Sequence, residues 1–428
     1  MSTQNFTSTP APAMARSLMG DPRRWLIVGL LFAASLINYF DRATVSFALP
    51  TIAADLHLGP NEKGTLLSAF FWSYALMQIP MGIFADRFNL RWLYAGAFVL
   101  WSLAQGLTGF TSSLAMLVVF RVLLGIGEAI YLPGGTRIVS LFFPLSERAF
   151  PCGLFDFGTR SGMVLEGVII PSMILGYGWR TTFAVVGFAA LLWLIPWLAV
   201  TPPQMRCPPP EPAQERIPLS WPAFFALLGN RNLIGICLGF FCFDYYWYLL
   251  VNWLPDYMVN VRHLTLQWAG IYAALPLLVF GVCQPIGGWV ADRLVRAGWD
   301  ETRVRKGIVS LAFLTGLLLI PAAHASSAKV ALALIMGGCL VGLSTANQLV
   351  ILQNCAPAVQ IGLWVGIFNF IGNIAGIIAA KLTGFLIAET NSYTPAFVLA
   401  AIMIAVGQLS FWLIVGPLRK QPEGAVTS

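Results

Sequence analysis

Charged side chains interrupt two long apolar stretches of the sequence. Arg121 and Glu128 stand seven residues apart within the apolar run 116–139, and Asp41 precedes Arg42 within the run 25–49. Charge in hydrocarbon is costly, so such residues normally face a protein interior or a wet cavity and are used there. A carboxylate that gains or loses an arginine partner can also bind and release a proton. Static ion pairs that hold helices together are the alternative, but buried pairs add little net stability.

The composition indicates a protein surrounded by lipid. The 428 residues are 58% hydrophobic and only 10% charged, with a mean hydropathy of +0.76, whereas soluble chains carry about 25% charged residues. The seven cysteines are scattered and form no CxxC or disulfide framework. No phosphate-binding loop occurs, and the three histidines fall in predicted outer loops. We therefore expect no enzyme activity, no metal, no cofactor and no nucleic-acid partner.

At about 20 apolar residues per membrane helix, the sequence predicts an all-α protein with twelve spans. These fall at roughly 25–49, 64–85, 92–110, 114–141, 149–176, 182–201, 231–255, 267–291, 307–323, 328–352, 361–388 and 394–416. The Pro-rich stretch 202–230 reads as a cytoplasmic linker between two six-helix halves, 25–201 and 231–418. Residues 1–24 and 419–428 are predicted cytoplasmic tails.

The distribution of Lys and Arg predicts the orientation in the membrane. With both termini inside, 16 of the 25 basic residues lie on the cytoplasmic side and 4 outside, while 5 lie within spans. This positive-inside bias places both tails in the cytoplasm, and it also explains the net charge of +7. We expect a multi-pass protein of a bacterial inner membrane that works as a monomer.

A short charged motif recurs at the same place in each half. Gly82-Ile-Phe-Ala-Asp86-Arg87, followed by Arg91, closes the second span, and Gly288-Trp-Val-Ala-Asp292-Arg293 closes the eighth, 206 positions later. Such recurrence indicates a duplicated fold. Because these residues lie at the cytoplasmic edge, we expect a gate between helices, formed by Asp86, Arg87, Arg91, Asp292 and Arg293.

These features resemble the major facilitator superfamily, from about residue 25 to residue 418. Its loop motif Gly-x-x-x-Asp-Arg-x-Gly-x-Arg is matched by Gly82, Asp86, Arg87 and Arg91, with Asn89 in place of the second glycine. A narrower resemblance to the anion:cation symporter branch rests on the blocks 38–42, 121–129, 155–162 and 178–183. Members of that branch carry sugar acids or phthalate-type carboxylates, usually with protons.

The resemblance implies roles for individual residues. Asp41 and Glu128 would carry protons, Arg42 and Arg121 would bind the anion, and Tyr39 and Tyr74 match tyrosines that contact substrate. At about 1.5 Å of rise per residue, Asp41, Arg42 and Arg121 share a level, and Glu128 lies about 10 Å nearer the cytoplasm. Departures occur at 130–133 and 155–157, where Phe155-Asp156-Phe157 replaces a common Asn-Ser pair.

Further intramembrane polar residues are candidates from their positions alone. Arg160 is expected to bind substrate or, equally, to pair with Asp156 at i, i+4. Asn369 and Asn373 share one face of the eleventh span and suit a hydroxylated substrate. Weaker candidates for the cavity, or simply for polar contacts and interfaces, are Glu166, Asp244, Lys381, the cluster 245–253 and Arg137, which is expected at the cytoplasmic interface.

The sequence thus predicts uptake of an organic carboxylate, such as an aldonate, aldarate, hexuronate or aromatic acid, by symport with protons; Na⁺ is less favoured. Two alternatives stay open. One is an organic-anion exchanger or exporter on the same fold, and the other is a membrane sensor that binds without transport. The coupling is expected to be favourable because an arriving anion competes for the arginine that would otherwise hold a carboxylate deprotonated.

Overall fold

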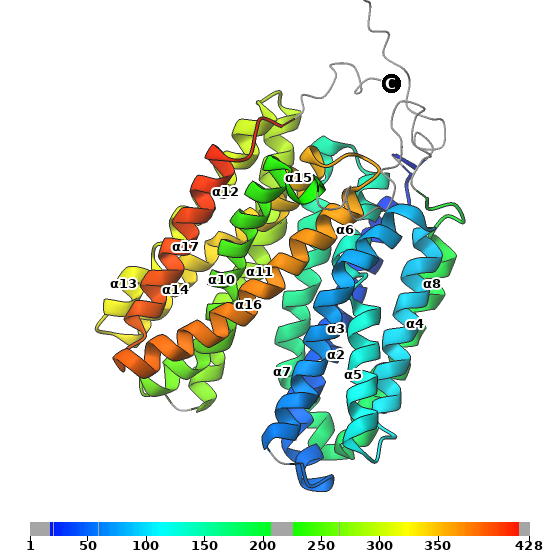
Figure 1. Cartoon of the computed structure of the whole chain (residues 1–428), viewed down its shortest axis with the longest axis vertical. Helices are drawn as coiled ribbons and strands as arrows, with labels where there is room; N and C mark the ends of the chain where they lie inside the picture. Colours follow the sequence, from blue (N-terminus) through cyan, green and yellow to red (C-terminus); the bar gives the residue numbers. More distant parts are fainter. Residues whose placement is uncertain (1–17, 20, 59, 207–225, 265, 419–428) are drawn as a thin grey trace, which may run out of the picture.

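The computed structural model describes residues 18–19, 21–58, 60–206, 226–264 and 266–418, and all regular elements among them are helical. Figure 1 shows two groups of helices side by side. The first group comprises α2 (Arg24–Asp55), α3 (Pro60–Arg87), α4 (Leu90–Thr108), α5 (Leu114–Glu128), α6 (Tyr131–Phe142), α7 (Ala149–Ala190) and α8 (Leu194–Val200). Most of both predicted tails and of the linker, residues 1–17, 207–225 and 419–428, lies outside the described residues.

The second group begins after the predicted linker. Its helices are α10 (Arg231–Asn260), α11 (Leu266–Arg296), α12 (Glu301–Gly316), α13 (Leu319–His324), α14 (Ala328–Gly338), α15 (Thr345–Cys355), α16 (Ile361–Thr390) and α17 (Thr394–Leu413), with the 3-10 turn η3 (Cys339–Ser344) between α14 and α15.

Each predicted span corresponds to helix in the structure, although the boundaries differ. Ten helical segments of the described chain are long and apolar enough to cross a membrane. The remaining two predicted spans correspond to α4 and to the first part of α7. The range of α7 contains two helices that meet at a kink at Gly178, whose φ of 76° and ψ of 162° are not helical, so it covers two predicted spans. A positive φ of this size is readily available only to glycine.

Polar caps set where several helices begin. Asn89 accepts a hydrogen bond from the backbone N–H of Arg91 at the start of α4, and Asn230 does the same for Asn232 at the start of α10. Asp300 caps α12 in this way. These side chains satisfy backbone donors that have no partner within the helix.

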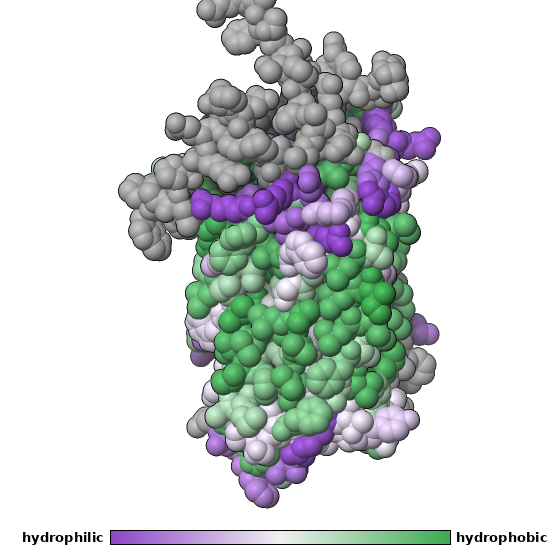
Figure 2. Space-filling model, turned by 90° about the vertical axis from the view of Figure 1, so that its right-hand side faces the viewer, coloured by the Kyte–Doolittle hydropathy of each residue, from purple (hydrophilic) through white to green (hydrophobic). Residues whose placement is uncertain are grey.

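The surface of the bundle is apolar in its middle and polar at its two ends. Figure 2 shows a hydrophobic band between two hydrophilic caps. Large side chains such as Trp72, Leu175 and Leu413 are more than half exposed. An exposed apolar band of this extent fits a bilayer, whose hydrocarbon core is about 30 Å thick.

The two halves meet at the end of the bundle where α2 begins and α17 ends, here called the terminal end. Arg305 of α12 donates to the carbonyl of Leu145 at 3.0 Å across the two halves. Close helix contacts follow from glycine. A Cβ on Gly82 of α3 would lie 2.3 Å from the carbonyl oxygen of Gly362 on α16, and one on Gly288 of α11 would lie 2.4 Å from that of Ala149 on α7. The repeated motif glycines therefore hold equivalent contacts.

We expect Gly82→Ala to open the terminal end, because the added methyl group overlaps the α16 backbone. Overpacking of this kind costs about 1–3 kcal/mol, enough to shift an equilibrium between two conformations by roughly tenfold. Distances between spin labels on the terminal ends of α3 and α16 would measure the shift. Gly96→Ala is the matched control, since a Cβ there meets nothing within 4 Å. Equal distances in both variants would show that the glycine contact does not hold the halves together.

Candidate functional site

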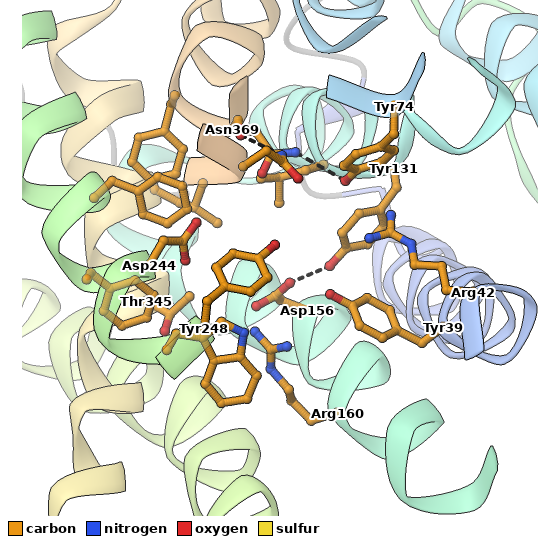
Figure 3. Close-up of a pocket in the computed structure, with 17 residues that line it drawn as sticks. Tyr39, Arg42, Tyr74, Tyr131, Asp156, Arg160, Asp244, Tyr248, Thr345 and Asn369 are labelled. Carbon is orange, nitrogen blue, oxygen red and sulfur yellow. Dashed lines mark hydrogen bonds between the residues drawn. The ribbon is translucent and has the colours of Figure 1, made fainter. Parts of the chain in front are cut away.

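A cavity with about 610 Å³ of empty space, including the part open to solvent, lies between the two halves. Figure 3 shows polar side chains that point into it from both halves. It is lined by Tyr39, Arg42, Tyr74, Tyr131, Leu132, Asp156, Arg160, Phe240, Phe243, Asp244, Trp247, Tyr248, Thr345, Leu349, Phe368, Asn369 and Asn373.

Arg42 of α2 is fixed at the cavity wall by an ion pair and by aromatic rings. Its Nε donates to Oε2 of Glu128 at 2.7 Å. Its guanidinium carbon lies 4.2 Å from the ring centroid of Tyr74 and 4.9 Å from that of Tyr39. The buried Nη2 has no hydrogen-bond partner among the described residues. Arg42 therefore keeps donor capacity for an anion in the cavity.

The other predicted charges form a buried layer behind Arg42. Glu128 and Asp41 have no exposed surface, and Arg121 is 3% exposed. Asp41 interacts electrostatically with both Glu128 and Arg121. Both carboxylate oxygens of Asp41 lack hydrogen-bond partners within the described chain. Arg121 was expected to bind the anion, but it does not line the cavity in this structure, and its guanidinium lies 4.9 Å from the ring of Phe70.

The alternative pairing of Arg160 with Asp156 is not formed. Arg160 of α7 lines the cavity and stacks on Trp247 of the other half, with 3.9 Å from guanidinium carbon to ring centroid. Asp156 instead accepts hydrogen bonds from the hydroxyl of Tyr131 and the amide of Gln284. Residues four apart on a helix can pair, but neutral donors from α6 and α11 occupy this carboxylate.

The predicted asparagines of α16 lie at the cavity, close to the first half. Asn369 Nδ2 donates to Tyr74 Oη at 3.2 Å across the halves. Asn373 Nδ2 donates to the backbone carbonyl of Asn369 at 2.7 Å. Both residues line the cavity, and an amide offers acceptor as well as donor atoms to a hydroxylated ligand.

Of the weaker candidates, only Asp244 and part of the aromatic cluster line the cavity. Glu166 is buried but is not part of the lining, and Lys381 is exposed on α16. Tyr131 and Leu132, from the departure at 130–133, line the cavity, whereas sequence reasoning missed Thr345 at the cavity and Gln284 behind it. It also missed the ring wall formed by Phe240, Phe243 and Phe368. The spacing of these phenylalanines along their helices did not indicate a cavity, since phenylalanine is common on any buried helix face.

The motif aspartates join the two halves at the terminal end. Asp86 of α3 accepts from the backbone N–H groups of Gly362, at 2.9 Å, and Leu363, at 2.8 Å. Asp292 of α11 accepts from the backbone N–H of Phe150 at 2.9 Å. Each carboxylate thus binds the first turn of a helix in the other half, where free N–H groups and the helix dipole favour negative charge.

The arginines that pair with these aspartates are not those of the motif. Asp86 pairs with Arg137 at 3.2 Å, and Arg137, which was expected at the cytoplasmic interface, is 2% exposed at this end of the bundle. Arg87 is exposed, and Arg91 donates to carbonyl groups of its own half.

The second half repeats this arrangement. Asp292 pairs with Arg305 at 3.2 Å, and Arg305 has no exposed surface. Arg293 is exposed, with its guanidinium 5.5 Å from the ring centroid of Trp289. In both halves the aspartate is thus neutralised by a buried arginine from another helix.

A bundle of twelve apolar spans in two similar halves, with a polar cavity between them, defines a multi-pass membrane transporter. The chain belongs to the Major Facilitator Superfamily, whose family model matches residues 31–380. This confirms the all-α twelve-helix fold, and the protein is a transporter rather than an enzyme.

Curated relatives place the chain near sugar-acid transporters of this superfamily. It is 31% identical over 402 residues to the probable L-galactonate transporter of Escherichia coli (strain K12), covering 90% of this chain and 88% of that protein. It is 30% identical over 423 residues to the probable galactarate/D-glucarate transporter GudP of Bacillus subtilis (strain 168), covering 93% of each. These relatives agree with the narrower resemblance seen in the sequence.

The fold also matches solved structures of the superfamily. The transporter FucP in the outward conformation superposes with a TM-score of 0.74 at 16% identity, over 91% of this chain and 99% of that chain. The proton:xylose symporter XylE gives a TM-score of 0.69 at 16% identity, over 92% and 96% of the two chains. At this identity the likeness concerns the fold.

We expect Arg137→Gln to destabilise the protein, since it leaves the buried Asp86 carboxylate without its cationic partner. Breaking a buried pair in this way costs about 3–5 kcal/mol. Thermal unfolding of the purified protein in detergent would measure the loss. Arg87→Gln is the matched control, because Arg87 is exposed one residue after Asp86 and surface charges contribute about 0–1 kcal/mol. A larger loss of thermal stability in Arg87→Gln than in Arg137→Gln would identify the motif arginine as the partner of Asp86.

Proposed function

We propose that the protein takes up an organic carboxylate, such as a sugar acid, together with protons. The observation that carries this proposal is the position of Arg42, which is held by Glu128 and two tyrosine rings with donor capacity left at the cavity. The relatives named as probable galactonate and galactarate/D-glucarate transporters support a polyhydroxylated acid as the substrate.

Binding of the anion follows from the chemistry of the cavity wall. The planar guanidinium groups of Arg42 and Arg160 suit a carboxylate, because each can offer two parallel N–H donors. Asn369 and Asn373 supply amide groups for hydroxyls of the substrate. The cationic groups of the cavity thus come from the first half, and the second half adds neutral amide groups.

Proton coupling follows from competition for Arg42. In the empty cavity Arg42 stabilises the ionised form of Glu128. A substrate carboxylate that binds Arg42 weakens this pair, and the buried Glu128 then favours its neutral, protonated form. Asp41, which lacks hydrogen-bond partners among the described residues and lies in the field of Arg121, is the second proton carrier. Proton and anion binding therefore favour each other.

The orientation of the protein in the membrane is part of the same proposal. We place the terminal end in the cytoplasm of a bacterial cell, with the protein in the inner membrane and acting as a monomer, since the positive-inside bias favours that orientation. The contacts of Gly82 and Gly288 then close the cytoplasmic side. Residues 25–201 and 231–418 would move against each other about the cavity, as in other transporters built from repeats.

Uptake into proteoliposomes under an imposed pH gradient tests the proposed function, with galactonate, glucarate, glucuronate and benzoate as probes. We expect wild-type protein to accumulate at least one of these acids along the proton flow. Glu128→Gln should abolish accumulation while exchange and binding persist, because the amide resembles the protonated acid but releases no proton.

Glu166→Gln is the control for this variant, since Glu166 is a buried glutamate that does not line the cavity and forms no ion pair within the described chain. Accumulation against the pH gradient would identify an exporter, and binding without flux would identify a sensor. Concentrative, pH-dependent uptake by Glu128→Gln would remove Glu128 from the coupling mechanism.

Arg42→Lys should weaken substrate binding by about ten- to a hundredfold, although the charge is kept. An ammonium group lacks the planar fork, and a hydrogen bond to a charged group contributes about 1.5–3 kcal/mol. Equilibrium binding to the purified protein measures the change. Arg180→Lys is the control, because Arg180 pairs with Asp55 at the other end of the first half and is 45% exposed. Unchanged affinity in Arg42→Lys would assign the anion to Arg160.

A further inference from the structure

One carboxylate at the cavity is left unexplained by binding of an anion. Asp244 of α10 lines the cavity and is 8% exposed, yet it forms no hydrogen bond or ion pair with any described residue. Asp156 differs from it, because Tyr131 and Gln284 donate to that group. Figure 3 shows Asp244 on the side of the space that lies opposite Arg42. An ionised carboxylate that is buried without a partner is costly, so it either takes up a proton or pairs with a cation.

A positive group lies about one helical turn from this carboxylate. Arg160 stacks on Trp247 at 3.9 Å, and Trp247 follows Asp244 by three residues on α10. Side chains three apart on a helix are neighbours, about 5–6 Å between Cβ atoms. Arg160 and Asp244 interact electrostatically but do not form an ion pair within 4 Å. The cavity thus presents a cation and an anion that are close but not bonded to each other.

Aromatic rings share the cavity with this carboxylate. Phe240, Tyr248 and Phe368 line it together with Asp244, and a Cβ on Gly372 would meet both Asp244 and Phe240. The rings of Phe240 and Phe368 stack with centroids 3.6 Å apart. On the α16 side, a Cβ on Gly372 would lie 2.1 Å from Oδ2 of Asp244, so only glycine leaves room for this carboxylate. Carboxylates and aromatic faces together are suited to an ammonium group, which the ring quadrupole also attracts.

We propose that the substrate carries an ammonium group as well as a carboxylate, with the ammonium at Asp244 and the carboxylate at Arg160 and Arg42. This inference rests on the proposed function and narrows its substrate class to amino-substituted organic acids. A substrate hydroxyl can also donate to Asp244, but it leaves the negative charge of that carboxylate uncompensated. An ammonium group supplies both the hydrogen bond and the compensating charge, and charged hydrogen bonds are the stronger ones.

The test compares pairs of acids that differ only by a hydroxyl or an ammonium group at the carbon next to the carboxylate. The pairs are lactate and alanine, malate and aspartate, and D-gluconate and 2-amino-2-deoxy-D-gluconate. Affinities are measured by equilibrium binding to the purified full-length protein. We expect the amino member of at least one pair to bind about tenfold or more tightly, the size of one charged hydrogen bond.

Variants link this preference to Asp244. Asp244→Asn should reduce the ratio of the two affinities to about one. Gly372→Ala should reduce the ratio as well, since its methyl group displaces the carboxylate without removing it. Asp156→Asn is the matched control, an aspartate of the same cavity whose partners are neutral donors, and it should keep the preference. Thermal unfolding of each variant identifies any that fail to fold.

The outcomes separate this inference from the proposed function. If hydroxy acids bind and no amino acid binds better, the ammonium site is overturned while carboxylate uptake stands. If Asp244→Asn changes the pH dependence of both members equally and keeps their ratio, Asp244 carries a proton instead. If none of the six acids and none of the earlier probes binds, the proposed function fails and this inference fails with it.

Discussion

The 2.7 Å ion pair between Arg42 and Glu128 is the interaction on which the cavity depends. Glu128 has no exposed surface, so its charge requires a cation close by. Arg42 meets this requirement with one N–H group and, between the rings of Tyr39 and Tyr74, stays at the cavity wall. The pair therefore fixes the anion-binding group and connects it to a site that can take up a proton.

Closure of the terminal end uses a different physical device. Asp86 and Asp292 each bind backbone N–H groups at the start of a helix in the opposite half. Such bonds need no particular side chain on the other half, and they break together when the helix end moves away. Glycines at the contacts let the helices approach to backbone distance. Contacts of this kind suit two halves that separate and rejoin, because the helices pack closely while few side chains of the opposite half take part.

The sequence was sufficient for the fold because lipid imposes strong constraints. Span length, the loop charges and the duplicated motif at Gly82 and Gly288 each follow from hydrophobic thickness or gene duplication, and single residues hardly affect them. Intramembrane charge likewise identified Arg42 and Arg160, which line the cavity, and Asp41 and Glu128 next to it.

Side-chain partners between distant helices could not be predicted from spacing. The spacing of Asp156 and Arg160 allows a pair along their own helix, yet Tyr131 and Gln284 reach Asp156 from two other helices. Arg137 was expected at the interface from its distance to the span end, but its pairing with Asp86 of another helix could not be read from that distance. Helix rotation and tilt decide such contacts, and neither is readable from the hydrophobic pattern of one span.

The charge of the substrate also bears on proton coupling. The lining of the cavity contains two arginines, Arg42 and Arg160, and two aspartates, Asp156 and Asp244. A hydroxy acid adds one negative charge to this set, whereas an amino acid with its carboxylate adds none. Since excess charge is costly in a buried site, the two substrates should differ by one in the protons carried with them. That difference is independent of the protonation of Asp41 and Glu128 in the empty cavity, because it depends only on the charge of the substrate.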